Sequence, residues 1–114
     1  MPVARRGYAL IIVPYNGKIA DITHADTNKH TLDLVTALAE TRKIISISVG
    51  ALRIFGTGGF NTYPNEGVTE NSSQFLHTHS KTVIILGGAN RLQYKLTVAN
   101  DDFDIYCFGY TVEA

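Results

Sequence analysis

The sequence predicts an all-β fold: an antiparallel β-sandwich of seven or eight short strands with at most one short helix. Apolar and polar residues alternate most clearly from Arg91 to Val98, as expected for a strand that buries one face of a sheet. Turn signals rich in Gly, Pro, Asn and Asp separate the short segments, which is typical of sandwiches and barrels. The regular helices that a doubly wound α/β fold requires are absent from the pattern.

The N-terminal part of the chain is expected to form a strand pair. Residues 1–6 are a short polar arm, which we expect to be flexible. Residues 8–13 are continuously apolar and predict a strand buried on both faces. Asn16-Gly17 is a strong hairpin signal, because both residues tolerate positive φ. Residues 18–22 would then be the return strand, and residues 23–31 a polar loop.

The middle of the chain contains one ambiguous segment. Residues 32–40 fit a short helix capped by Thr31 or Asp33, but the start of the segment also alternates like a strand. Residues 44–55 are rich in β-branched side chains and predict a strand. A glycine-rich break at 56–59 and a turn within 60–67 follow, and residues 74–79 predict a short strand.

The last third of the chain predicts three consecutive antiparallel strands, at 81–86, 91–98 and 103–112, with turns between them. The final strand is apolar on both faces. Strict alternation assigns its residues to two groups: Phe103, Ile105 and Cys107, and opposite them Tyr106, Phe108, Tyr110 and Val112. One face fills the core, so the other face must be buried by a second layer of the same chain or by a second copy of it. We therefore expect Tyr106, Phe108 and Tyr110 to form a subunit interface or a ligand-binding face.

Composition limits the class of protein. With 114 residues, the chain is expected to be a single domain, residues 1–114. Its charged share of 18% is below the roughly 25% usual in soluble domains, which favours self-association. The formal net charge is zero, and no basic stripe indicates nucleic-acid binding. The single cysteine, Cys107, allows no internal disulfide.

No targeting or membrane segment is expected. The apolar run at 8–13 is shorter than the ~7–15 residues of a signal-peptide core and the ~20 residues of a membrane helix. The expected location is therefore cytoplasmic or particle-associated.

His77-Thr78-His79 is the sharpest local motif. Residues i and i+2 of a strand share a face, so these two imidazoles could converge on one metal ion. A third ligand would come from His24, His30, Asp26 or a symmetry mate. The motif lacks the upstream glycine and downstream carboxylate of the cupin pattern, so no cofactor is expected.

In strand pattern and length, the chain resembles the small jelly-roll subunits of viral and phage particles and trimeric proteins of the tumour-necrosis-factor type. The resemblance implies a jelly-roll-like fold and a structural, non-enzymatic subunit that forms a symmetric homo-oligomer, with a trimer or pentamer favoured. No family motif matches residue by residue, so the resemblance implies no site residues.

Two alternatives stay open. One is a carbohydrate-binding module in which the aromatic face lies beside polar residues such as Asn61, Asn65 and Gln93. The other is a small metal enzyme of the cupin type using His77 and His79.

Overall fold

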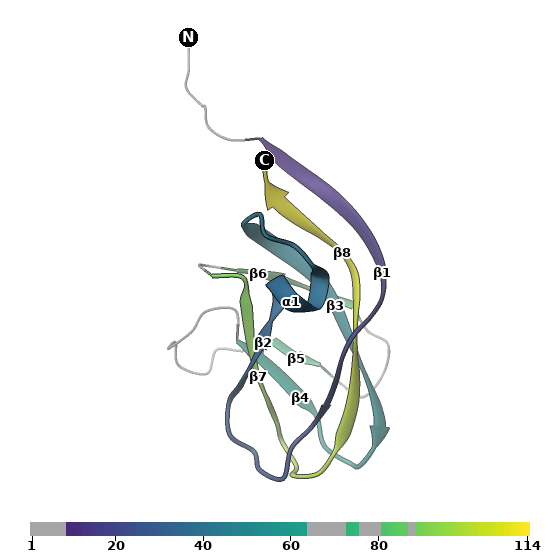
Figure 1. Cartoon of the computed structure of the whole chain (residues 1–114). Coiled ribbons are helices and arrows are strands. Elements are labelled where there is room, and N and C mark those ends of the chain that lie inside the picture. Colours follow the sequence, from purple (N-terminus) through teal and green to yellow (C-terminus); the bar gives the residue numbers. More distant parts are fainter. Residues whose placement is uncertain (1–8, 64–72, 76–80, 87–88) are drawn as a thin grey trace.

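The computed structural model describes residues 9–63, 73–75, 81–86 and 89–114 (Figure 1). The described residues form two four-stranded antiparallel sheets and one short helix. This confirms the predicted antiparallel β-sandwich. The predicted flexible arm at residues 1–6 lies outside the described residues.

Successive strands lie in different sheets, except that β4 and β5 are neighbours in the same sheet. The first sheet has the order β1 (Leu10–Thr23), β8 (Asp102–Glu113), β3 (Ile44–Phe55) and β6 (Lys81–Ile85). The second sheet has the order β2 (His30–Asp33), β7 (Arg91–Leu96), β4 (Phe60–Tyr63) and β5 (Ser73–Phe75). Helix α1 (Leu34–Leu38) follows β2.

The pairing order is that of a jelly roll. β1 pairs with β8, β2 with β7, β3 with β6 and β4 with β5, so each strand pairs with its counterpart counted from the other end. This is a long two-stranded ribbon folded over on itself, and the fold adds the pairs β3·β8 and β4·β7. The expected jelly-roll-like architecture is therefore present.

The core lies between the two sheets. The Phe60 and Phe103 rings, from opposite sheets, have their centroids 5.5 Å apart. The largest fully buried side chains are Phe60, Phe103, Leu34, Ile44, Ile47, Leu92, Leu96, Ile105, Val49 and Val112. The alternation in β3, β7 and β8 thus points one face of each strand inward.

The hairpin predicted at Asn16-Gly17 is wrong. β1 continues through these residues, and the β1·β8 register shifts between Pro14 and Gly17. The long β8 offers pairing partners to both halves of β1, so the Asn-Gly pair forms an irregularity in a continuous strand and not a turn.

Burial of residues 8–13 on both faces is also not observed. β1 is the outermost strand of the first sheet, and Leu10 and Ile12 are 53% and 80% exposed. Val13 alone among the described residues of this run packs against the core. Residue 8 lies outside the described part of the chain. A continuous apolar run therefore marks an exposed edge strand here.

The ambiguous segment at 32–40 contains both a strand and a helix. β2 ends at Asp33, which is also the N-cap of α1: its carboxylate accepts hydrogen bonds from the Val35 N–H and the Thr36 hydroxyl. Ala39 ends the helix in the left-handed conformation. The strand predicted at 74–79 begins as β5, and its remainder, 76–79, lies outside the described residues.

Candidate functional site

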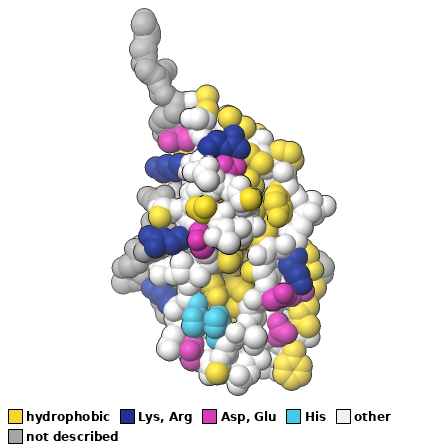
Figure 2. Space-filling view, viewed as in Figure 1, with side chains coloured by type: hydrophobic (Ala, Val, Ile, Leu, Met, Phe, Trp, Pro, Cys, Tyr) yellow, Lys and Arg dark blue, Asp and Glu magenta, His cyan; other side chains and the backbone are white. Residues whose placement is uncertain are grey.

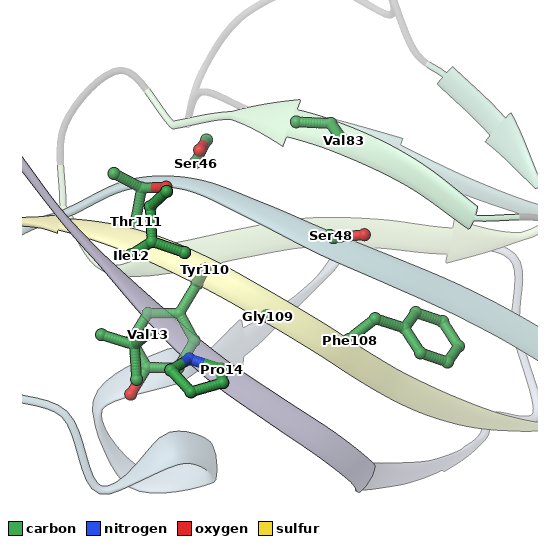
Figure 3. A pocket seen from close by; sticks show the side chains of 10 residues that line it. All are labelled: Ile12, Val13, Pro14, Ser46, Ser48, Val83, Phe108, Gly109, Tyr110 and Thr111. Atoms are coloured by element: carbon green, nitrogen blue, oxygen red, sulfur yellow. The ribbon is translucent and has the colours of Figure 1, made fainter.

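The outward face of the first sheet carries an open depression of about 490 Å³ (Figure 3). Its lining comes from four neighbouring strands: Ile12, Val13 and Pro14 of β1, Phe108 to Thr111 of β8, Ser46 and Ser48 of β3, and Val83 of β6. Ile12 and Val83 are 80% and 63% exposed. The small serines at its centre leave room above the sheet between larger apolar side chains.

A β-bulge shapes this depression. Ser48 pairs with Gly109 and the next residue, Val49, pairs with Cys107, so Phe108 is an extra residue in β8 relative to β3. Gly109 has a φ of 142°, a conformation that L side chains rarely adopt. The bulge shifts the alternation of β8 by one residue.

The shift separates the three predicted face residues. Cys107 and Tyr110, three residues apart, are both buried, at 0% and 7% exposure. Phe108 and Tyr106 are partly exposed. Placing Tyr110 and Val112 on the same face as Phe108 was therefore wrong, because strict alternation takes no account of a bulge.

Tyr110 takes part in a buried polar cluster. Its hydroxyl donates to Glu40 Oε1 at 3.0 Å, and Glu40 accepts two side-chain hydrogen bonds of 2.9 Å from Arg42. The hydrogen bonds from Arg42 lower the pKa of Glu40 to about 2. Burial, followed by the hydrogen bond to Glu40, raises the pKa of Tyr110 to about 12. This cluster fixes the end of α1 against β8.

The other end of the outward face is charged. Tyr106 pairs with Lys18 of β1 on one side and Gly50 of β3 on the other. Lys18 forms ion pairs with Asp21 at 2.9 Å and with Asp104 at 3.8 Å. The face thus passes from a charged end, through the two partly exposed rings of β8, to the apolar depression.

The predicted metal ligands His77 and His79 lie outside the described residues. In the part of the chain that the structure describes, no group of three or more His, Cys, Asp or Glu side chains is placed to hold a metal ion. Cys107 is fully buried, and burial raises the pKa of its thiol.

Two histidines that the sequence suggested only as third ligands form a cluster of their own. His24 and His30 stack with ring centroids 3.5 Å apart, and histidine side chains lie together at the surface in Figure 2. His24 Nε2 lies 2.8 Å from the Tyr94 hydroxyl, and His30 Nε2 lies 2.9 Å from Asp26 Oδ1. One nitrogen of each ring is thus already hydrogen-bonded within the protein. The β2·β7 register, which pairs His30 with Tyr94, brings these side chains together.

The carbohydrate hypothesis requires aromatic and amide side chains on one face. Asn61 and Gln93 belong to β4 and β7 of the second sheet, whereas Phe108 belongs to the first. The structure therefore does not bring together these parts of the expected sugar platform.

Comparison of the chain with models of protein families, with curated proteins and with solved structures gave no match. The helix in the described part of the chain is too short to cross a membrane.

Proposed function

We propose that this chain is a non-catalytic structural subunit that assembles into a closed homo-oligomer through the outward face of its first sheet. The depression beside Phe108 is the observation that supports this proposal. Exposed aliphatic side chains on two strands, Ile12 and Val83, flank it. Exposed apolar patches of this kind mark interaction surfaces in soluble proteins.

Burial of the apolar side chains around the depression would stabilise a contact with another subunit. Removing an Ile or Val side chain from water contributes about 1.5–3 kcal/mol. A side chain from a neighbouring subunit could fill the space above Ser46 and Ser48. The charged end formed by Lys18, Asp21 and Asp104 would lie at the periphery of such a contact, as a polar rim commonly does in protein interfaces.

Closed symmetry is the usual outcome when identical soluble subunits associate. A contact between this face and a different surface of the next copy would close into a ring, with a trimer or pentamer favoured. We extend the proposal to a role as a building block of a larger particle, such as a virion.

The test is the molar mass in solution of wild type and Phe108→Asp, by light scattering after size-exclusion chromatography. We expect a defined wild-type oligomer and a folded Phe108→Asp monomer. Truncation of a hot-spot residue at the centre of an interface costs about 2 kcal/mol or more of binding energy, and a charge at this position would weaken assembly at least as much.

Phe55→Asp is the matched control, because Phe55 is 71% exposed at the far end of β3 and outside the depression. This variant should keep the wild-type mass. Circular dichroism would verify folding of both variants. A wild-type monomer, or a folded Phe108→Asp oligomer of unchanged mass, would refute the proposal and direct the next experiments to a glycan array.

A further inference from the structure

The exposed edge of β1 is a second surface with a definite chemistry. β1 has 14 residues, whereas the other outermost strands of the two described sheets, β6, β2 and β5, have 5, 4 and 3. Short strands are one way in which proteins protect a sheet edge from pairing with another chain. Leu10, Ile11 and Ile12 are 53%, 39% and 80% exposed. The first part of β1 therefore lacks this protection.

Two backbone hydrogen bonds fix the direction in which the backbone groups of this edge point. The Glu113 N–H donates to Lys43 O, toward β3, and the Ala114 N–H donates to Ala9 O, toward β1. Leu10 is opposite Glu113, so its N–H and C=O point away from β8.

Ile12, two residues further along and opposite Thr111, has the same orientation. The backbone of Pro14 also faces away from β8, so no hydrogen bond to β8 is lost because proline has no N–H. Leu10 and Ile12 thus direct two N–H and two C=O groups outward. No charged residue lies between Leu10 and Val13 to discourage pairing.

We propose that two copies of this chain join through these edges, with the β1 strands antiparallel and Leu10 of one copy opposite Ile12 of the other. A two-fold axis then passes beside Ile11. The four outward groups of each copy all find partners, and the two first sheets become one continuous sheet.

The side chains favour a second copy as the partner. In this register Leu10 of each copy lies beside Ile12 of the other on one face, and the two Ile11 side chains meet on the opposite face. Apolar cross-strand pairs of this kind stabilise antiparallel strands. The zero net charge of the chain adds no overall repulsion between copies. The contact is isologous, because the same segment serves both subunits.

This inference goes beyond the face contact proposed above and does not depend on it. A ring formed through the outward face and a two-fold contact formed through the β1 edge would together give a dihedral assembly.

The experiment compares Ile12→Pro with Ile12→Thr by light scattering after size-exclusion chromatography. Both variants remove the Ile12 side chain, but only proline removes the outward N–H, and neither removes a donor to β8. We expect the assembly of Ile12→Pro to have half the mass of the Ile12→Thr assembly. Equal masses for the two folded variants would overturn the inference.

A cross-linking experiment covers the case in which Ile12→Pro fails to fold. Directly opposed residues of a non-hydrogen-bonded antiparallel pair have Cα atoms about 4.5 Å apart, within the range that a disulfide spans. Ile11→Cys should therefore form a covalent dimer under mild oxidation, while the buried Cys107 of wild type forms none. Failure of folded Ile11→Cys to cross-link would contradict the proposed register and pairing.

These outcomes separate the two proposals. If only the edge contact exists, Phe108→Asp keeps the wild-type mass and Ile12→Pro halves it. If only the face contact exists, Phe108→Asp gives monomers, and Ile12→Pro and Ile12→Thr have equal masses.

Discussion

Asp101 illustrates how a single residue determines a loop. Asp101 is 3% exposed, and its carboxylate accepts a hydrogen bond of 2.6 Å from the Gly58 N–H. The glycine-rich loop at 56–59 therefore binds a carboxylate of its own chain. A Cβ at Gly58 would lie 2.7 Å from Thr97 Oγ1, so the absence of a side chain is what allows the approach.

Gly56→Ala should destabilise the protein by about 1–3 kcal/mol, the usual cost of a strained backbone position. Gly56 has a φ of 114°, and an added Cβ would collide with the Asp101 carboxylate. Urea unfolding measures the effect. Gly17→Ala is the control, because its Cβ would meet only Tyr15 Cε1, at an ordinary 3.6 Å. Equal stability of the two variants would show that Asp101 does not constrain the loop.

At the scale of elements, β8 organises the first sheet. It pairs with β1 along one side and β3 along the other, and its bulge at Phe108 decides which aromatic rings enter the core. Helix α1 has only five residues, so its stability depends on its cap and on the burial of Leu34 and Leu38.

Asp33→Ala should lower the free energy of unfolding by about 1 kcal/mol, the typical value of an N-cap. The mutation removes the acceptor for the Val35 N–H at the point where β2 becomes α1. Asp33→Ser keeps a capping oxygen and should restore most of the loss. Thermal unfolding of the three proteins gives the comparison, and an alanine variant as stable as wild type would count against the capping role.

At the scale of the whole molecule, the connection between β1 and β2 joins the two sheets. His24, just beyond the end of β1, lies beside Tyr94 of β7, and the Tyr94 ring stacks on Phe60 with centroids 5.2 Å apart. Phe60 in turn contacts Phe103 of the first sheet. The histidine cluster is thus the outer end of an aromatic contact path through the core.

This arrangement predicts acid-sensitive stability. Burial, followed by repulsion from His30, lowers the pKa of His24 from its ordinary 6.5. The folded state therefore disfavours protonation, and the unfolded state binds more protons once the pH falls below about 6.5. Stability should be level above this pH and should fall as the pH decreases below it.

Urea midpoints measured across this range, for wild type and His24→Gln, provide the check. Glutamine keeps a polar group near the Tyr94 hydroxyl but does not titrate, so the decline in stability below about pH 6.5 should flatten. Asp26 acts in a lower range: its hydrogen bond from His30 lowers its pKa below the ordinary 3.8, and the stability it provides is lost only as the pH falls below that value. An unchanged slope in His24→Gln would exclude His24 as the source.

Several features of the fold could be predicted because they depend on residues near one another in sequence. Alternation over 91–96 and 103–107 correctly identified inward-facing side chains, whereas Val98, assigned to the same face as Leu96, lies beyond the end of β7 and is 41% exposed. The predicted hairpin at Asn16-Gly17 failed because the turn preference of two residues is weaker than the pairing of both flanking segments with β8. The expected aromatic face was split because a bulge, which depends on pairing with β3, changed the phase of β8.

The sequence by itself determined the fold class, the approximate positions of most strands and the inward-facing side of β7 and of the first half of β8. These follow from local alternation and turn preferences, which act over two to four residues. Only the tertiary structure decided which strands pair, that β1 is an exposed edge, and that His24 and His30 stack. Those features depend on the register between strands whose residues lie up to about a hundred positions apart in the sequence. The strand pairing that forms is the one that buries the apolar side chains of all strands together.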